Sequence, residues 1–312
     1  MIRTILSGAK GLPRGYMKVG DDVAVVPAGR GGLVVKVDML VEGTDMPKKM
    51  TYRQAARKAV AMCVSDFAAK GVRPDSFMVS LGLRRGTSGA DVAGLARGFR
   101  DAEEEWGVKL VGGDTNESKE LVVDCVMLGF AERVVERRGA KPGDLLVVTG
   151  GFGLPPAGLR ILSGRARCSA SFRERAVGSV LSPSPALGVG LALAPYLTSS
   201  MDSSDGLARC LHTIGAMSRV GFELNSIPAS SGVSLFAREN GLNYERLVWA
   251  GGEEYIVVGT TGRRRLPAAR RAVGRAGGTL LVIGKATGER KVVLRRGRAE
   301  KPIPDEGWTH LD

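Results

Sequence analysis

The sequence predicts an α/β fold built from two domains, the first of them a mixed sheet covered by helices. Apolar runs typical of strands alternate with segments whose apolar residues recur at helical spacing. The chain has 312 residues, and single hydrophobic cores stop growing at roughly 250–300 residues. A charged, turn-rich segment at residues 137–144 is typical of a domain boundary. We therefore expect an N-terminal domain at residues 1–138 and a C-terminal domain at residues 139–312.

The first domain contains the clearest helix signal of the chain. Residues 52–70 form a long segment of helix-forming residues, with Thr51 suited to the N-cap and Gly71 to the C-cap. A second helix is expected at residues 91–106, where apolar residues recur every three or four positions. The strands expected in this domain are residues 32–37, 77–83, 109–111 and 121–130.

The second domain begins with an apolar strand at residues 145–149. Pro183 and Pro185 break any helix that reaches them. The other expected elements are a helix near residues 157–162, a strand ending near Met201, a helix at residues 206–217 and strands at residues 255–260 and 279–284.

The net charge of +13 favours anionic partners, either nucleic acids or small phosphates. Basic residues cluster at residues 133–141, 263–275 and 290–301 without interleaved aromatic residues. Nucleic-acid binders commonly place stacking side chains beside such charge, so we expect small phosphates and no nucleic acid. The plain alternative is that these clusters are solvated surface. The 44 glycines, about twice the usual share of roughly 7%, predict many tight turns and close backbone approaches.

Several other classes of protein are disfavoured by composition. The four cysteines lie far apart without CxxC spacing, which argues against a zinc site and gives no support for a disulfide framework. Only His212 and His310 are available for a histidine relay. No P-loop motif is present. The first residues carry no long apolar segment, and no run approaches the roughly 18 apolar residues of a membrane span, so we expect a cytoplasmic protein that enters no membrane.

Carboxylates in this basic chain recur in pairs or beside glycines at wide intervals. They are Asp21, Asp22, Asp38, Asp66, Asp114, Asp202 and Asp205. Like charges gathered in a cleft repel each other unless they hold cations, and clusters of oxygen ligands suit Mg²⁺ ions that bridge phosphates. These acids therefore predict a metal and nucleotide site assembled from distant segments.

Each acid also has a simpler interpretation. Asp21 and Asp22 are suited to a local turn, and Gly112 to Thr115 to a glycine turn between strands. Ser204 or Asp205 is suited to the N-cap of the following helix, although backbone N–H groups at the same position attract phosphate. Asp66 has the weakest simple explanation. It lies on the apolar side of its helix near the C-terminus, where the helix dipole disfavours an anion.

Taken in order, seven motifs closely resemble the thiamine-monophosphate kinase family. They are GDDVAVV at residues 20–26, VDMLVEG at 37–43, VSDFAAKG at 64–71, LVGGDT at 110–115, RGAKPGD at 138–144, DSSDGL at 202–207 and GGEEY at 251–255. The resemblance extends to the tail at residues 307–311. This family belongs to an ATP-binding superfamily that also contains aminoimidazole ribonucleotide synthetase and selenophosphate synthetase.

The resemblance implies phosphorylation of thiamine monophosphate to the diphosphate with ATP and Mg²⁺, and a homodimer formed through N-terminal sheets. The implied magnesium ligands are Asp22, Asp38, Asp66, Asp114, Asp202 and Asp205. The implied nucleotide contacts are Gly113, Asp114, Arg137 and Ser204, and the implied substrate contacts are Asp45, Glu253 and Trp308. Among these, Asp22, Asp114 and Asp205 are the implied catalytic residues. We expect Trp308 to stack on the cationic thiamine rings and Glu253 to complement their charge, unless Trp308 only anchors the tail.

The chain departs from the family pattern at two places. Lys36 and Val37 stand where the family usually has small hydroxyl residues before Asp38. Lys36 either substitutes for a cation or contacts a phosphate directly. Asp45 replaces a histidine that is common near the substrate phosphate.

Two other functions stay open at this point. The first is another ATP-dependent enzyme of the superfamily. No cysteine precedes Cys63, which disfavours selenophosphate synthetase, and residues 225–229 lack the Asn-Ile-Pro-Arg pattern of aminoimidazole ribonucleotide synthetase. The second is a catalytically silent nucleotide-binding protein, which has less need for six aligned carboxylates.

Overall fold

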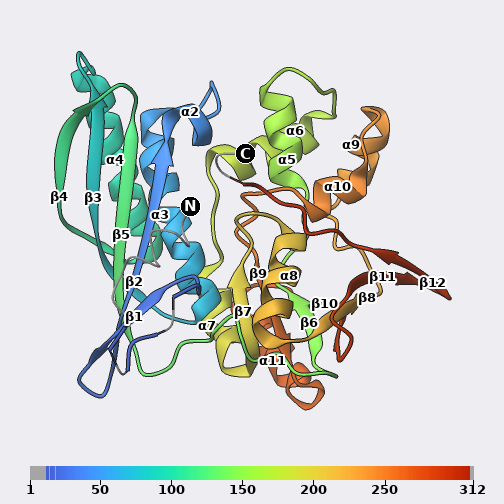
Figure 1. Cartoon of the computed structure of the whole chain (residues 1–312). Helices are drawn as coiled ribbons and strands as arrows, with labels where there is room; N and C mark the ends of the chain where they lie inside the picture. Colours follow the sequence, from blue (N-terminus) through green and yellow to red (C-terminus); the bar gives the residue numbers. More distant parts are fainter. Residues whose placement is uncertain (1–11, 14, 18, 310–312) are drawn as a thin grey trace.

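The computed structural model describes residues 12–309 except 14 and 18, and it arranges them around two β-sheets (Figure 1). The segment between the sheets, residues 132–144, contains neither helix nor strand, and the expected domain boundary after residue 138 falls within it. His310 and residues 1–11 lie outside the described part of the chain. Within that part, none of the helices combines the length and the apolar character needed to cross a bilayer.

The N-terminal sheet is mixed and has the strand order β1-β2-β5-β3-β4. Its strands are β1 Ala24–Ala28, β2 Gly31–Val41, β3 Pro74–Arg84, β4 Lys109–Ser118 and β5 Val122–Ala131. Neighbouring strands pair antiparallel except β3 and β4, which run parallel. The mixed α/β fold predicted from the sequence is confirmed.

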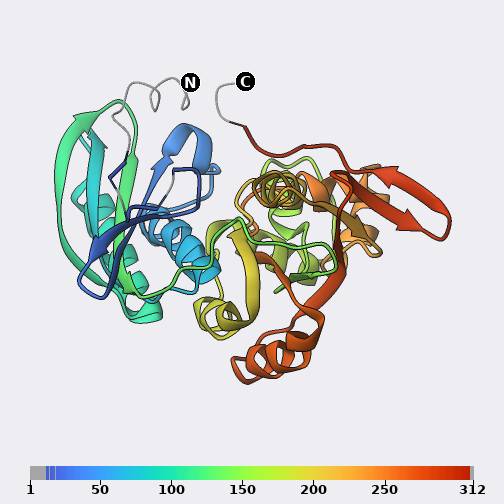
Figure 2. The ribbon, with the colours of Figure 1, turned by 60° about the horizontal axis from the view of Figure 1, so that its bottom comes forward.

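Helices α3 (Tyr52–Lys70) and α4 (Gly89–Trp106) cover one face of this sheet, and the short helix α2 (Glu42–Asp45) follows β2 (Figures 1 and 2). Helix α3 begins and ends where its sequence predicts. Thr51 and Gln54 form a reciprocal capping box, and Gly71 closes the helix in the left-handed conformation. The helix also packs against elements of the C-terminal half. It is therefore buried nearly all round and lies between the two halves of the molecule.

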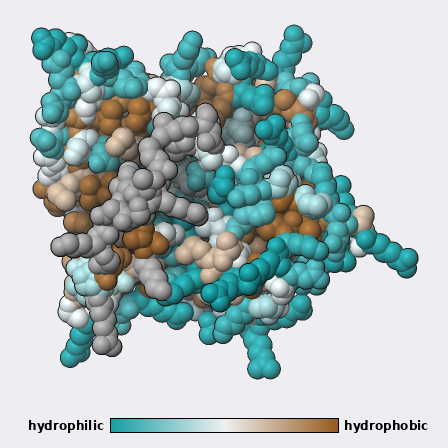
Figure 3. All heavy atoms as spheres, viewed as in Figure 1, coloured by the Kyte–Doolittle hydropathy of each residue, from teal (hydrophilic) through white to brown (hydrophobic). Residues whose placement is uncertain are grey.

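The opposite face of the N-terminal sheet is exposed and apolar. Strand residues alternate between the two faces, so Lys36 and Asp38 lie on the face that α3 covers, beside buried Met127 and Cys125 of β5. The alternate positions on the other face include Val37, Met39, Met78 and Phe130, which are large exposed hydrophobic residues. Figure 3 shows hydrophobic residues on the part of the surface formed by the N-terminal sheet.

The C-terminal sheet has seven strands in the order β12-β11-β8-β10-β6-β9-β7. Its strands are β6 Leu145–Val148, β7 Leu197–Asp202, β8 Gly221–Leu224, β9 Val257–Thr261, β10 Leu281–Thr287, β11 Val292–Arg296 and β12 Ala299–Pro302. The helices of this half are α5 Leu154–Leu162, α6 Ala170–Leu181, α7 Leu187–Leu193, α8 Leu207–Ser218, α9 Val233–Glu239, α10 Tyr244–Trp249 and α11 Leu266–Arg275.

Two of the simpler interpretations of the acidic motifs are wrong. Gly112 to Thr115 continue strand β4 and form no turn, because β4 pairs with β3 from Lys109 to Ser118 with one irregularity before Gly112. Gly113 fits there because a Cβ atom would lie only 2.1 Å from the carbonyl oxygen of Val79. Neither Ser204 nor Asp205 caps helix α8. Its N-cap is Gly206, which has a φ of 112° and makes no side-chain cap hydrogen bond.

Candidate functional site

Three buried carboxylates meet beside helix α3. Asp22 precedes β1, Asp66 comes from α3 and Asp202 ends β7. One carboxylate oxygen from each lies within 4.8 Å of the others. The cluster thus joins segments that are far apart in the sequence, as the pattern of acids predicts.

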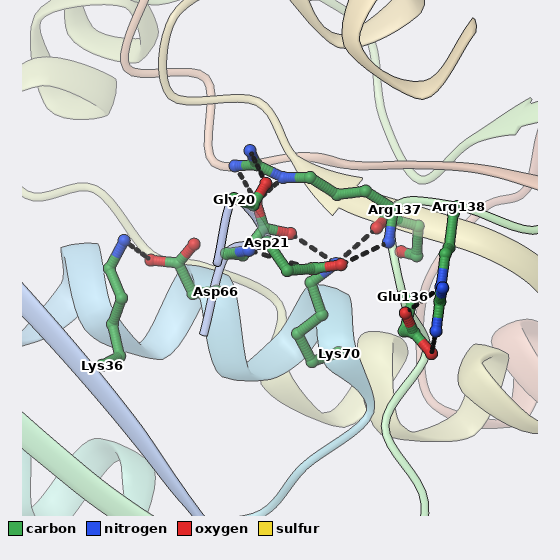
Figure 4. A network of polar contacts seen from close by, with 10 residues as sticks. Gly20, Asp21, Lys36, Asp66, Lys70, Glu136, Arg137 and Arg138 are labelled. Carbon is green, nitrogen blue, oxygen red and sulfur yellow. Dashed lines mark hydrogen bonds and ion pairs between the residues drawn. The ribbon is translucent and has the colours of Figure 1, made fainter. Parts of the chain in front are cut away.

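Asp22 is held between two cations. Lys70 Nζ lies 2.6 Å from Asp22 Oδ2, and the Arg137 guanidinium contacts Asp22 Oδ1 through both Nε and Nη2. Lys70 Nζ also lies 2.6 Å from Asp21 Oδ1 and donates to the carbonyl oxygen of Ser200 at 2.5 Å (Figure 4). Burial alone would raise the pKa of Asp22, but the charges of Lys70 and Arg137 outweigh it and hold that pKa below its ordinary value.

Asp66 faces a third cation from the neighbouring sheet. Lys36 Nζ lies 2.9 Å from Asp66 Oδ2 (Figure 4). It also lies 3.1 Å from Asp38 Oδ1. Burial and the nearby charge of Asp202 nevertheless raise the pKa of Asp66 well above its ordinary value. The same acids raise the pKa of Lys36, although burial opposes the rise. Lys36 therefore only partly offsets the negative charge around Asp66.

Asp202 accepts a hydrogen bond from a hydroxyl group and makes no ion pair with a cation among the described residues. Ser65 Oγ donates to Asp202 Oδ2 at 3.0 Å. Burial and the charge of Asp22 raise the pKa of Asp202 to about 6. The raised pKa values of Asp66 and Asp202 mean that burial and neighbouring acids disfavour their ionised forms, which a further cation would stabilise. The donors are oxygen atoms only, which suits Mg²⁺.

A second group of predicted residues lies on the loops just beyond Asp202. The backbone N–H of Glu253 donates to the Ser204 carbonyl oxygen at 2.6 Å, and the N–H of Trp308 donates to the Asp205 carbonyl oxygen at 3.0 Å. These bonds bring Ser204, Asp205, Glu253 and Trp308 together at the start of α8. Glu253 has a φ of 61°, a conformation that L-residues adopt at a cost.

Glu253 is tied to α3 by an ion pair. Lys58 is almost fully buried, pairs with Glu253 Oε1 and donates to the Asp45 carbonyl oxygen at 2.9 Å. Glu253 Oε2 is buried and has no hydrogen-bond partner among the described residues. Glu253 also lines a cavity of about 210 Å³ together with Glu254 and Tyr255. A carboxylate with one free oxygen beside a cavity can complement a cationic ligand.

Gly113 and Asp114 lie apart from these groups, and Asp45 joins them only through its carbonyl oxygen, which accepts from Lys58. The Asp45 carboxylate accepts hydrogen bonds from Val41 N at 2.8 Å and from Thr44, so it stabilises its own short helix. Gly113 and Asp114 are exposed on β4, the edge strand, with β3 and β5 between them and β2. Asp114 pairs with Ser80, which is exposed, whereas neighbouring Val79 faces the core. The structure thus places Asp114 outside the carboxylate cluster.

Comparison with known proteins assigns the chain to a family. Residues 20–131 match the model of the AIR synthase related protein, N-terminal domain. The chain is 37% identical over 294 residues to the thiamine-monophosphate kinase of Nitrosopumilus maritimus, covering 94% of each chain. It belongs to the thiamine-monophosphate kinase family. The family member from Pyrococcus horikoshii is 34% identical over 295 residues, which cover 94% of this chain and 91% of that one.

A solved structure of the same family has the same fold. It is AaThiL complexed with AMPPCP and TMP, and it superimposes with a TM-score of 0.86 at 25% identity, covering 99% of this chain and 94% of that one. The correspondence spans both halves of the molecule. The resemblance deduced from the sequence motifs is confirmed.

Sequence reasoning missed two lysines of this thiamine-monophosphate kinase family member. Lys58 and Lys70 are not among the predicted site residues, yet both are almost fully buried and bind site carboxylates. A signal was available, because α3 is rich in alanine on all sides and Lys70 follows Asp66 by one helical turn. Trp106, by contrast, packs in the N-terminal core, with Arg57 over its ring.

Proposed function

We propose that this chain is a kinase that transfers the γ-phosphoryl group of ATP directly to thiamine monophosphate, with Mg²⁺ as the metal. The observation that carries the proposal is the buried cluster of Asp22, Asp66 and Asp202 at the contact between the two halves of the molecule. Membership of the thiamine-monophosphate kinase family supports the same activity. We further propose that residues 1–138 and 139–312 act as two domains that complete the site together.

The cluster fits the metal that this activity requires. Asp22, Asp66 and Asp202 would hold Mg²⁺, with Asp38 beside them, and all the ligand atoms are carboxylate oxygens. When bound, Mg²⁺ supplies positive charge that reduces repulsion between the two polyanionic substrates. The raised pKa values of Asp66 and Asp202 support the fit, since burial and neighbouring acids disfavour their ionised forms and a bound cation would favour them.

The transfer requires little acid–base catalysis from the protein. The acceptor is a phosphate oxygen, which is mostly ionised near neutral pH because the second pKa of a phosphate monoester is about 6. No strong base is therefore needed, and His212 is used elsewhere, with Nε2 bonded to the Ile303 carbonyl oxygen at 2.9 Å. Arg137, oriented by Asp22, offers a fixed cation, and the uncapped N-terminus of α8 offers N–H groups to a phosphate.

The thiamine end is assigned to Glu253 and Trp308. Both lie at the start of α8, next to Ser204 and Asp205. The free oxygen of Glu253 complements the positive charge of the thiazolium ring, and the half-exposed indole of Trp308 offers a face for stacking. Asp45 stays a predicted substrate contact on the ground of its place in the sequence motif. Its carboxylate accepts a hydrogen bond from Val41 N, at the start of its own helix.

The activity is tested by measuring ADP formation with ATP and Mg²⁺ in the presence of different acceptors. We expect ADP to form with thiamine monophosphate and not with thiamine, which has no phosphate oxygen to accept the transfer. A related superfamily enzyme with another substrate would show no dependence on thiamine monophosphate. A silent nucleotide-binding protein would bind ATP and release no ADP with either acceptor.

We also propose that the exposed face of the N-terminal sheet pairs with a second copy of the chain. Phe130 is 67% exposed and Met39 is 55% exposed, on neighbouring strands of the same face. Such a contiguous apolar face is typical of an interface. Sedimentation should give a dimer for the natural chain and a monomer for the double variant Met39→Asp, Phe130→Asp. Leu235 is an exposed residue of α9, and the variant Leu235→Asp should stay dimeric. A monomeric natural chain would contradict the proposal.

A further inference from the structure

Lys36 lies where a cation would be expected to bind between two carboxylates. Its side chain extends from β2 on the face covered by α3 and ends 2.9 Å from Asp66 Oδ2 and 3.1 Å from Asp38 Oδ1. Its side chain is 19% exposed, and that of Asp66 is 5% exposed. The contact is thus part of the buried cluster and differs from a surface ion pair, whose partners move in water.

The other cations of the cluster have different partners. Lys70 contacts Asp21 and Asp22, and Arg137 contacts Asp22. Among the described residues, Lys36 is the cation whose ion pairs join Asp38 and Asp66. Five acids (Asp21, Asp22, Asp38, Asp66 and Asp202) therefore share three fixed positive charges, and one of the three serves the Asp38 and Asp66 side alone.

An ammonium group and a magnesium ion cannot share this position. Mg²⁺ binds oxygen ligands at about 2.0–2.1 Å, so an ion bridging the two oxygens that contact Lys36 Nζ would overlap the ammonium group. Two positive charges at such a separation also repel each other strongly in a buried site. The two carboxylates hold either the lysine or a bridging metal ion.

We propose that Lys36 is a built-in cation that occupies the Asp38 and Asp66 side of the cluster and replaces one divalent ion. Divalent ions are thereby confined to the side formed by Asp22, Asp202 and the remaining oxygen of Asp66. Lys36 is a positioning residue that sets the number of metal ions and their place. The inference rests on the proposed function for the presence of metal, and its test counts bound ions without turnover.

The test measures Mn²⁺ binding by the paramagnetic signal of the free ion, without nucleotide. The variant Lys36→Met should bind one Mn²⁺ ion more than the natural chain. The affinity of this extra site should be about tenfold or more above that of any weak further Mn²⁺ binding by the natural chain. Lys36→Arg keeps the charge and should give the natural count. Lys285→Met removes a lysine that pairs with Glu223 in the C-terminal sheet, away from the cluster, and should also give the natural count.

The thermal midpoint gives a second readout. Lys36→Met should melt at a lower temperature without metal and recover most of the loss when Mg²⁺ is added, whereas the natural chain should gain much less. If Lys36→Met does not fold without metal, Lys36→Gln, which keeps hydrogen-bond donation to the carboxylates and removes the charge, takes its place. An unchanged Mn²⁺ count in folded Lys36→Met or Lys36→Gln would overturn the proposal. Absence of kinase activity with the predicted counts would instead contradict only the proposed reaction.

Discussion

Replacement of Lys70 by methionine is expected to lower the free energy of unfolding by about 3–5 kcal/mol. The Lys70 side chain is fully buried and lies 2.6 Å from both Asp21 and Asp22, whose side chains are also buried. Its loss removes the ammonium group that both carboxylates share. Arg137 remains, with its backbone N–H bonded to Asp21 and its guanidinium paired with Asp22. The Ser200 carbonyl oxygen loses its bond from Lys70 as well. Urea unfolding without metal measures the change.

A surface pair provides the matched control for Lys70. Arg138 pairs with Glu136, and both side chains are at least one-third exposed. Exposed pairs of this kind contribute about 0–1 kcal/mol, so Arg138→Met should leave the unfolding free energy within that range. A loss below about 1 kcal/mol for Lys70→Met would show that the buried ion pairs do not stabilise the fold as described.

Replacement of Asp205 by asparagine is expected to lower turnover by about 10²–10³-fold while leaving the fold intact. Asp114→Asn tests whether Asp114, which lies outside the carboxylate cluster, contributes to turnover as the family resemblance implies. Asp205 lies at the start of α8 beside Ser204 and Trp308, and Asp114 is exposed on β4, so neither change disturbs a core. Steady-state kinetics and circular dichroism measure the two effects. The exposed residue Asp75 on β3 provides the control, and Asp75→Asn should keep full activity.

The two variants also separate two parts of the proposed site. Full activity in both would contradict a catalytic or metal-binding role for these acids. Loss in Asp205→Asn with full activity in Asp114→Asn would confine the site to the cluster beside α3, and would make Asp114 a surface residue of the edge strand. Loss in both would require that β4 also contributes to catalysis.

Local signals explain which elements the sequence predicts well. Helix α3 is bounded by Thr51 and Gly71, whose capping roles depend only on neighbouring residues. Strand β4 was predicted too short because its glycines favour turns, and its true length follows from pairing with β3, which is a non-local contact. Short elements of the C-terminal half, such as α9, α10, β11 and β12, were missed, since few residues carry their periodicity.

The site likewise contains residues that local motifs predict and residues whose role depends on non-local packing. The motifs identify Asp22, Asp66 and Asp202 as important residues, and the structure brings them together. Lys58 and Lys70 were missed because lysine on a helix is normally solvated, and their burial depends on the C-terminal half packing on the other side of α3. The place of Lys36 follows from strand alternation and the register of β2 with β5, which places it on the face covered by α3.

The central claim is that the γ-phosphoryl group of ATP is transferred to thiamine monophosphate. Phosphorus NMR of a reaction with ATP, Mg²⁺ and thiamine monophosphate follows every phosphate in one experiment. We predict that thiamine diphosphate and ADP appear in equal amounts as ATP and thiamine monophosphate disappear together. Two results would contradict the claim, and in both thiamine monophosphate stays unchanged. In the first, ATP binds and stays intact; in the second, ATP is converted to ADP and inorganic phosphate.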